Sequence, residues 1–305
     1  MRAVVLRAYG GPDELVAEEV PDPAPGPGQV LVEVAVAGIT FVETQVRAGR
    51  GPRRPELPAI LGNGVAGTVL AVGEGVDGSL TGGQVVSSLG GLGGYAELAV
   101  ANAADLIPLP AHRTAEEAVA LLADGRTAVG LTRAAAPERG EWVLVEAAGG
   151  GVGGLLVQLA VRAGARVVGA AGSANKRLAA ERLGAEVTVD YTANGWADEV
   201  RRATGGLDVV FDGVGGEIGA SAQGLLRDGG RLSVYGMAGG PMTTPGEGVT
   251  AVAFPQVDLR ELAREAIDGP LRPTIGLRLP LERAARAHAA IESRTVTGKT
   301  LLLPR

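Results

Sequence analysis

Five of the six residues from 149 to 154 are glycine, so this stretch carries almost no side chains. Residues 146–154 read EAAGGGVGG, directly after the apolar run 142–145, and the apolar pattern resumes at Leu155. A strand that leads into glycines and then a helix lets the backbone approach a pyrophosphate, and the helix N-terminus offers N–H groups and positive dipole. The stretch therefore predicts a dinucleotide site. Two registers fit its spacing: Gly149-x-Gly151-x-x-Gly154 and Ala148-x-Gly150-x-x-Gly153.

The end of the next predicted strand distinguishes the two common dinucleotides. Sheets that bind NAD commonly place Asp or Glu there for the ribose hydroxyls, but residues 166–177, RVVGAAGSANKR, contain no acid. Ser173, Lys176 and Arg177 stand there instead, and a hydroxyl with a cation suits a 2′-phosphate that an acid would repel. Arg177 also fits the solvated face of a helix, which is the interpretation we favour for it. This strand end thus predicts NADPH.

Strands and helices alternate after residue 115 at intervals of about 20 to 25 residues, which is typical of a parallel sheet with crossover helices. The short strands are apolar along most of their length, as expected when helices cover both faces of the sheet. We predict strands at 142–147, 166–171, 187–190, 207–212 and 231–236, and helices at 115–135, 153–163, 174–183, 196–203 and 217–227.

The first part of the chain and its tail have a different character. Up to residue 107, short β-branched runs such as 30–36 and 67–73 alternate with turn residues, which predicts an irregular, mostly β module. In the tail, residues 281–291 have the apolar spacing of a helix and 300–303 predict a strand. Because the tail resembles the β module, we predict an α/β protein whose parallel-sheet domain, 119–259, is inserted into a first domain made of 1–118 and 260–305.

Composition excludes several classes of function. Apolar residues make up 46% of the 305 residues, charged residues 20%, and the net charge is −6, which describes a globular protein and disfavours a nucleic-acid partner. The absence of cysteine excludes disulfides, thiolate catalysis and cysteine-ligated zinc. Of the two histidines, we predict that His288 packs on the apolar face of the tail helix and that His112 lies at the surface.

No stretch approaches the roughly 18 apolar residues of a membrane span. The apolar segment before Arg7 is too short for a secretory signal. We therefore predict no membrane association and a cytoplasmic location.

Six motifs occur in a joint order that is far more specific than any one of them: GYAELAV at 94–100, DGRTAVGLTR at 124–133, AAGGGVGGLLVQLA at 147–160, LDVVFDGVGG at 207–216, GRLSVYGMAGG at 230–240 and ESRTVTGKTLLLP at 292–304. Over nearly its whole length the chain resembles the medium-chain dehydrogenase/reductase superfamily, in particular its zinc-independent quinone oxidoreductase (ζ-crystallin-like) branch. The resemblance implies a Rossmann doubly wound parallel sheet inserted into a GroES-like catalytic domain.

The resemblance also implies roles for particular residues. The family pattern A-x-G-G-V-G selects the register with Gly150, Gly151, Val152 and Gly153 around the pyrophosphate. The other implied cofactor contacts are Ser173, Lys176 and Tyr191 around the 2′-phosphate, Thr127 and Val214 on the nicotinamide side, Tyr235, Gly236 and Met237 at the end of the fifth strand, and Lys299, which closes the pocket from the tail. Tyr191 also fits a half-buried aromatic residue that ends a strand.

Two positions separate this chain from the zinc-dependent members that it resembles. Where those carry a ligand cysteine after Gly-Ile and His-Glu after a glycine, this chain has Thr40 and Asn63-Gly64. The four-cysteine structural lobe has no counterpart either, so we predict no bound metal. Without a Lewis acid to stabilise an alkoxide, alcohol oxidation is disfavoured, and reduction of an electrophile that accepts hydride unaided is favoured.

We therefore predict direct hydride transfer from C4 of NADPH to a quinone or similar conjugated acceptor, in the cleft between the two domains. Quinones need little acid or base, and no Ser–His–Asp or paired-carboxylate arrangement stands out. Relatives usually read N-x-x-D-x-Y-x-R-x-G where residues 40–49 read TFVETQVRAG. The candidate catalytic residues are Thr40, Gln45 and Asn63, and Gln45 cannot donate a proton as a phenol does.

Two alternatives stay open. One is an NADPH-dependent reductase of α,β-unsaturated carbonyls or enoyl thioesters, and the other is an NADPH-sensing binding protein with little turnover. The segment between Gly240 and Pro280 is shorter than in relatives, with a predicted sixth strand at 249–254 and a helix at 258–267. Because this strand commonly pairs with its mate across a two-fold axis in the superfamily, we predict a homodimer.

Overall fold

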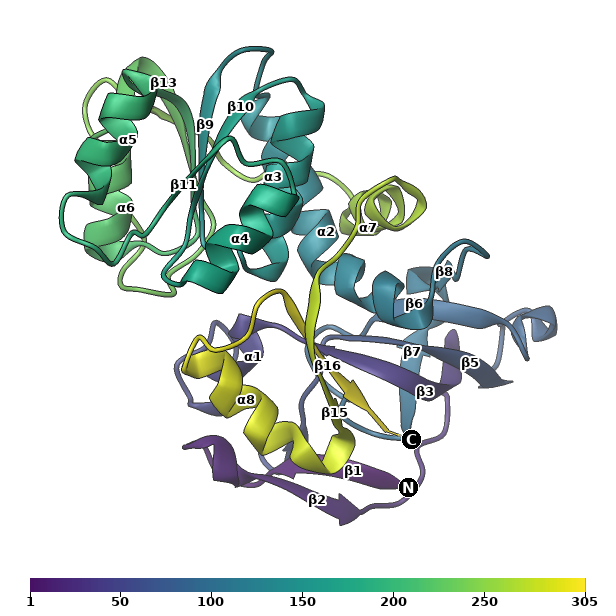
Figure 1. The fold of residues 1–305 in the computed structure, drawn as a ribbon. Coiled ribbons are helices and arrows are strands. Elements are labelled where there is room, and N and C mark those ends of the chain that lie inside the picture. Colours follow the sequence, from purple (N-terminus) through teal and green to yellow (C-terminus); the bar gives the residue numbers. More distant parts are fainter. Residues whose placement is uncertain (305) are drawn as a thin grey trace. The chain divides into compact units, whose positions relative to one another are not determined.

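The computed structural model describes residues 1–304, and the chain divides into two compact units. The first unit consists of Met1–Ala123 and Ala263–Arg305, and the second of Asp124–Leu262. The middle of the chain therefore forms a unit of its own between two segments that fold together. Figure 1 shows the elements of each unit.

The second unit is built on a six-stranded parallel sheet with the order β11-β10-β9-β12-β13-β14. The strand order reverses between β9 and β12, which is the switch point where open α/β sheets bind ligands at the carboxyl ends of their strands. The strands are β9 (Trp142–Glu146), β10 (Arg166–Ala170), β11 (Val187–Val189), β12 (Leu207–Asp212), β13 (Leu226–Val234) and β14 (Thr250–Ala251).

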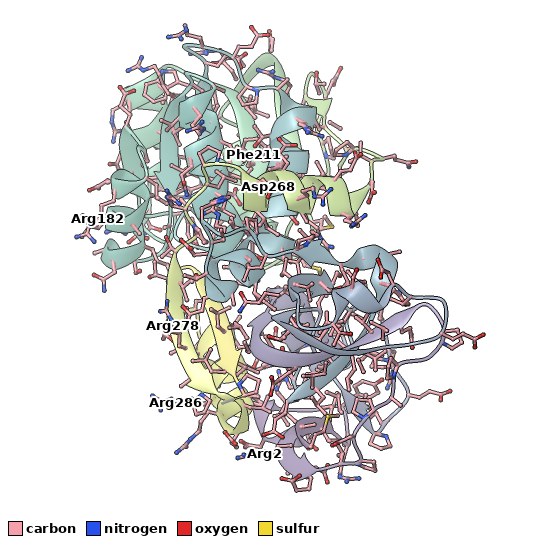
Figure 2. The ribbon with its side chains drawn as sticks, turned by 90° about the vertical axis from the view of Figure 1, so that its right-hand side faces the viewer. Arg2, Arg182, Phe211, Asp268, Arg278 and Arg286 are labelled. Atoms are coloured by element: carbon pink, nitrogen blue, oxygen red, sulfur yellow. The ribbon has the colours of Figure 1, made fainter. Side chains whose placement is uncertain are left out.

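Helices cover both faces of this sheet. Helices α3 (Gly151–Arg162) and α4 (Ala174–Arg182) lie on one face, and α5 (Trp196–Thr204) and α6 (Gly216–Gln223) on the other (Figure 1). The apolar strands are consequently buried on both sides, as Leu144 and Phe211, both 0% exposed, illustrate. Phe211 lies inside the unit, whereas Arg182 points outward from the end of α4 (Figure 2).

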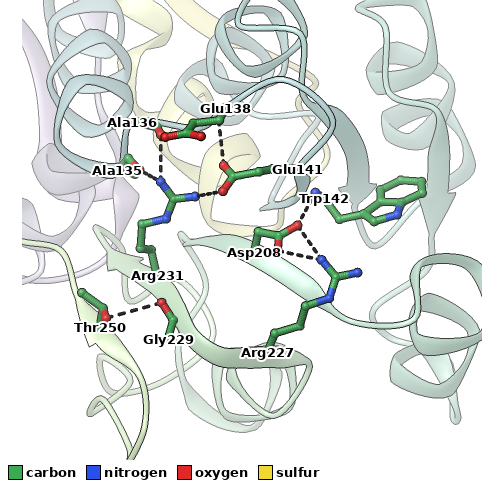
Figure 3. A network of polar contacts seen from close by, with 10 residues as sticks. All are labelled: Ala135, Ala136, Glu138, Glu141, Trp142, Asp208, Arg227, Gly229, Arg231 and Thr250. Atoms are coloured by element: carbon green, nitrogen blue, oxygen red, sulfur yellow. Dashed lines mark hydrogen bonds and ion pairs between the residues drawn. The ribbon is translucent and has the colours of Figure 1, made fainter.

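Ion pairs tie together the amino ends of the strands, away from the glycine stretch (Figure 3). Asp208 accepts a hydrogen bond from the backbone N–H of Trp142 at 2.7 Å and forms an ion pair with Arg227 at 2.6 Å. Arg231 donates to the carbonyl of Ala135 at 2.7 Å and pairs with Glu141. These contacts stabilise the sheet at this edge and leave the carboxyl edge for other groups.

The first unit contains a seven-stranded sheet and a three-stranded sheet. The strand order of the larger sheet is β15 (Ile275–Pro280), β16 (Lys299–Leu303), β3 (Gln29–Ile39), β5 (Gly64–Val72), β6 (Gln84–Ser88) and β8 (Ile107–Pro108). A seventh strand, β7 (Leu98–Asn102), also pairs with β3. The smaller one consists of β2 (Leu15–Glu19), β1 (Arg2–Leu6) and β4 (Ala59–Ile60). Thr300 of β16 lies opposite Ile39 of β3, so the tail rejoins the β module as predicted.

Four further helices belong to the description. They are α1 (Phe41–Arg47), α2 (Ala115–Ala135), α7 (Leu259–Asp268) and α8 (Ala284–Glu292). Ala284, Ala287 and His288 of α8 are buried, and Arg278 and Arg286 point outward from β15 and α8 (Figure 2). His288 is therefore a packed residue and His112 an exposed one, as predicted. Within residues 1–304, no helix has both the length and the apolar character required to cross a membrane.

The predicted parallel sheet is confirmed, and the largest differences lie at the ends of elements. The helix predicted at 217–227 ends at Gln223, because Leu226 already pairs with Leu207 and so belongs to β13. The sixth strand is only two residues long instead of 249–254. Helix α1 and strand β15 were not predicted.

Candidate functional site

The glycine stretch forms a tight turn between β9 and α3 in the second unit. The N–H of Gly150 donates to the carbonyl of Ala147 at 2.7 Å, and the helix begins at the next residue, Gly151. The first N–H groups of a helix have no acceptor within the helix. The turn therefore presents donors and the positive end of the dipole at the carboxyl edge of the sheet, where an anion binds well.

At Gly151 and Gly153 the turn has no room for a side chain. A Cβ atom on Gly153 would lie 2.3 Å from the carbonyl oxygen of Ala147, and one on Gly151 would lie 2.0 Å from Oδ2 of Asp124. A Cβ on Gly150 would meet only the carbonyl of Ala147, at 3.1 Å. Val152 is half-buried beside them in the first turn of α3. A bare backbone that ends in a helix N-terminus fits a dinucleotide pyrophosphate.

The three residues predicted around the 2′-phosphate lie at the carboxyl ends of β10 and β11. Ser173 is the exposed residue that precedes α4, and Lys176 belongs to the first turn of this helix. The side chain of Lys176 packs over Gly149, since a Cβ on that glycine would lie 2.5 Å from the Lys176 Cβ. The ring of Tyr191 approaches Gly172, where a Cβ would lie 3.2 Å from its Cε2 atom. The fold thus brings Ser173, Lys176 and Tyr191 to one edge of the sheet.

Arg177 has a partner within the protein. Its guanidinium forms an ion pair with Asp190 at 2.6 Å and is 25% exposed, so it is not simply a solvated residue of the helix face. Hydrogen bonds from Thr192, followed by the contact with Arg177, lower the pKa of Asp190. This pair links α4 to the segment after β11.

Backbone hydrogen bonds connect the segment after β12 to the segment after β13. The N–H of Tyr235 donates to the carbonyl of Asp212 at 2.9 Å, and that of Gly239 donates to the carbonyl of Val214 at 2.7 Å. A Cβ on Gly236 would lie 2.2 Å from the carbonyl oxygen of Gly213, so only glycine permits this approach. The predicted residues Val214, Tyr235 and Gly236 are consequently held together. Met237 next to them is 56% exposed, and Thr127 is a half-buried residue of α2.

In the first unit, a buried carboxyl group connects two of the candidate catalytic residues. Glu43 is 3% exposed, and its two oxygens accept hydrogen bonds from the backbone N–H groups of Thr40 at 2.5 Å and Asn63 at 2.8 Å. Burial raises the pKa of Glu43, while the hydrogen bond from Thr40 and the positive charge of Lys299 oppose that rise. The contact fixes the start of α1 relative to the start of β5.

The other two residues predicted in this unit have different surroundings. The side-chain amide of Gln45 donates to its neighbour Thr44 at 3.1 Å. Lys299, at the start of β16, is 4% exposed and acts electrostatically on Glu43. The side chain of Asn63 accepts a hydrogen bond from Ser88 at 3.3 Å.

Behind Glu43 lies a buried pair that the sequence did not predict. The hydroxyl of Tyr95 is 3.0 Å from Nε2 of His288, and both residues are 0% exposed. Burial, followed by the charge of Glu43 and a hydrogen bond with it, raises the pKa of Tyr95 well above its ordinary value. Burial and then the charge of Arg47 lower the pKa of His288 to about 3. These shifts keep both Tyr95 and His288 neutral in the core.

The lowered pKa of His288 predicts sensitivity to acid. Below the unfolded-state pKa of 6.5 the unfolded chain binds a proton that the folded protein takes up only near pH 3, so stability falls as the pH drops between these values. Relative to the His288→Gln variant, the wild type should lose at most about 1.4 kcal/mol per pH unit in this window. The measurement is the free energy of unfolding from urea titrations between pH 3 and pH 7. Parallel curves for the two proteins would contradict this prediction.

Three buried polar residues, Glu43, Glu146 and Tyr95, were not predicted from the sequence, although the sequence contains a signal for the first two. Thr40-x-x-Glu43 is a capping-box pattern that predicts a helix start. Glu146 is an acidic residue at the end of the apolar strand β9, and a buried carboxyl group there needs a hydrogen-bond partner. Tyr95 lies in GYAELAV without a local signal. No group of three or more His, Cys, Asp or Glu suited to a metal ion occurs within residues 1–304.

Two family models match the chain. Residues 26–111 match the alcohol dehydrogenase GroES-like domain, and residues 151–264 match the zinc-binding dehydrogenase domain. The first match lies in the first unit, and the second begins at the glycine turn.

Similar proteins are known at full length. A quinone oxidoreductase of Pseudomonas aeruginosa is 34% identical, and the alignment covers 99% of each chain. A 2-haloacrylate reductase of a Burkholderia species is 32% identical with the same coverage. Among solved structures, the Escherichia coli quinone oxidoreductase in complex with NADPH is 30% identical, covers 100% of both chains and has a TM-score of 0.90.

Proposed function

This chain belongs to the quinone oxidoreductase branch of the medium-chain dehydrogenase/reductase superfamily, and on that premise we propose that it is an NADPH-dependent quinone oxidoreductase. The observation that carries the proposal is the turn at 149–154, in which Gly153 has no room for a Cβ atom and the α3 N-terminus offers its N–H groups. The proposed acceptor is a quinone or a similar small conjugated electrophile.

The second unit would hold the cofactor along the carboxyl edge of its sheet. Gly150, Gly151, Val152 and Gly153 would donate backbone N–H groups or make room for the pyrophosphate. Ser173 and Lys176 would receive the 2′-phosphate, with the ring of Tyr191 beside it. The nicotinamide side would be formed by Thr127, Val214, Tyr235, Gly236 and Met237.

NADPH supplies a hydride from C4 of its nicotinamide ring when it is bound. The chain's own residues position the reactants and exclude water, which accounts for a large share of catalysis in a reaction that needs little acid or base. In the first unit, Thr40 and Asn63 offer a hydroxyl and an amide whose backbones are fixed by Glu43. We assign them, with Gln45, to the acceptor, and Lys299 to the closure of the pocket.

A panel of acceptors tests the function. We expect oxidation of NADPH, followed by its absorbance, with benzoquinone and naphthoquinone and little with an alkenal or crotonyl-CoA. Turnover of the thioester alone would overturn the quinone assignment. Binding of NADPH without turnover of any acceptor would indicate an NADPH-sensing protein instead.

A second activity is supported by the relative named a 2-haloacrylate reductase. Such a substrate is an α,β-unsaturated carboxylate, which also accepts hydride at carbon. The same panel extended by 2-chloroacrylate separates the two, and a kcat/KM for it above that for both quinones would favour this alternative.

Preference for NADPH over NADH should depend on Lys176. The Lys176→Ala variant loses a charge-assisted contact to the 2′-phosphate, so Kd for NADPH should rise roughly 10- to 100-fold while Kd for NADH changes little. Isothermal titration of both nucleotides measures the effect. The matched control is Arg177→Ala, because the side chain of Arg177 already pairs with Asp190. This variant should change the Kd values for NADPH and NADH equally. An equal effect of Lys176→Ala on NADPH and NADH would refute the assignment.

The homodimer and the cytoplasmic location stay predictions. Strand β14 lies at the edge of its sheet with an unpaired side that could accept a second copy, and its two residues, Thr250 and Ala251, are exposed. Light scattering of the purified protein gives its mass in solution.

A further inference from the structure

Two carboxyl groups end neighbouring strands of the parallel sheet directly below the predicted nicotinamide segment. Phe211 of β12 lies opposite Val145 of β9, so the residues that follow, Asp212 and Glu146, end their strands side by side. Both side chains are 0% exposed. They are 66 positions apart in the sequence and meet only because β9 and β12 are neighbours at the switch point of the sheet.

The two carboxyl groups hold the same backbone segment. Oδ1 of Asp212 accepts hydrogen bonds from the N–H groups of Val214 at 2.9 Å and Gly215 at 2.7 Å. Oε2 of Glu146 accepts from Val214 at 3.1 Å. The second oxygen of each group, Oε1 of Glu146 and Oδ2 of Asp212, is buried and receives no donor from residues 1–304.

Two buried carboxylates in this arrangement would repel each other. One proton shared between the two groups removes the repulsion, since a protonated carboxyl donates while a carboxylate accepts. Burial, followed by the hydrogen bond and the charge of Asp212, raises the pKa of Glu146 to about 10. Burial, followed by the charges of Glu146 and Asp212, raises the pKa of Tyr235, so the phenol near the pair stays neutral.

We propose that Glu146 is a positioning residue for the nicotinamide half of the cofactor: as a neutral acid it shares one proton with Asp212, and the pair holds Val214 and Gly215 in place. This inference rests on the proposed function, because Val214 faces the nicotinamide only if NADPH binds at this edge. Glu146 itself does not touch the cofactor in this proposal, since its carboxyl group lies below the segment that it holds.

Infrared spectra of the protein without nucleotide test the shared proton directly. At pH 8 the wild type should show the carbonyl band of a protonated carboxylic acid, and the Glu146→Gln variant should lack it. The control is Glu186→Gln, which removes an exposed acid at the opposite edge of the same sheet and should keep the band. Absence of the band from the wild type, or its presence in Glu146→Gln, would overturn the proposal.

Binding of two nucleotides tests the positioning role. Glutamine at 146 can still donate to Asp212, so Kd for NADPH should stay within about twofold of the wild type. Glu146→Leu leaves the buried carboxyl of Asp212 without its proton-sharing partner, and Kd for NADPH should rise roughly tenfold. Adenosine 2′,5′-bisphosphate lacks the nicotinamide half, and its Kd should be the same in all these proteins.

The outcomes separate this proposal from the proposed function. A purely structural role for Glu146 would weaken NADPH and the bisphosphate together in Glu146→Leu, or neither, and would overturn the positioning role. Circular dichroism spectra establish that the variant is folded. If the wild type bound neither nucleotide, the proposed function would fail and the positioning role with it, while the infrared result on the shared proton would stand.

Discussion

Replacing Gly153 by alanine should weaken NADPH binding about 10- to 100-fold, because the added methyl group overpacks the turn that holds the pyrophosphate. The new Cβ would lie 2.3 Å from the carbonyl oxygen and 2.8 Å from the carbonyl carbon of Ala147. Both are backbone atoms, so relief requires the turn itself to move. The same carbonyl accepts the N–H of Gly150, and its displacement alters the donors at the helix N-terminus. Fluorescence titration with NADPH measures the change in Kd.

The neighbouring glycine provides the control for this prediction. A Cβ on Gly154 would meet Cδ1 of Leu183 at 3.1 Å, which is the far end of a flexible side chain that can shift. Gly154→Ala should therefore bind NADPH nearly as the wild type does. Equal Kd values for the two variants would show that crowding at Ala147 is not what limits binding.

The contrast between these glycines also indicates how far the sequence determines the site. The spacing of 149–154 allowed two registers, and only the resemblance to relatives selected the one with Gly150 and Gly153. In the structure a Cβ on Gly153 would face a backbone carbonyl and one on Gly154 the end of a side chain. The glycines of the other register, Gly149 and Gly151, are crowded as well, so the choice of register stays a prediction. The atoms that an added Cβ would meet lie outside the glycine stretch, so the spacing of the glycines alone does not predict them.

The parallel sheet could be predicted because its signals are local. The strands are short apolar runs separated by helical segments, and the predicted 166–171 and 207–212 agree with β10 and β12 within one residue. Helix α1 has a local signal too, because Thr40 and Glu43 form a capping box at its start. The carboxylate of Glu43 points inward to two backbone N–H groups.

Long-range polar pairs could not be predicted in the same way. Glu146 was visible as an acid at the end of an apolar strand, but its partner Asp212 follows only from the strand order. Tyr95 and His288 are 193 positions apart and meet in the core of the first unit. The sequence predicts which residues are buried more readily than which buried polar groups contact each other.

Arg47 is another buried polar residue whose partner the sequence does not reveal. Its side chain is 1% exposed, and one of its nitrogens pairs with Glu292 at the end of α8. The other two, Nε and Nη1, have no hydrogen-bond partner among residues 1–304. The guanidinium therefore depends on one carboxylate to compensate a buried charge, and the pair connects α1 to α8.

Removal of Glu292 should consequently destabilise the first unit. We expect Glu292→Ala to lose roughly 3 kcal/mol of unfolding free energy, since a buried charge without its partner is strongly unfavourable. Urea unfolding followed by circular dichroism measures the loss. Both tryptophans, Trp142 and Trp196, belong to the second unit, so tryptophan fluorescence reports that unit and should change less.

Two further variants distinguish charge from packing in this prediction. The double variant Arg47→Met with Glu292→Leu removes both charges and keeps apolar volume, so it should recover most of the lost stability. Glu116→Ala breaks the partly exposed pair with Arg278 in the same unit and should cost less than about 1 kcal/mol. A double variant as unstable as Glu292→Ala would assign the loss to packing between α1 and α8, because the buried charge would then be absent and the penalty unchanged.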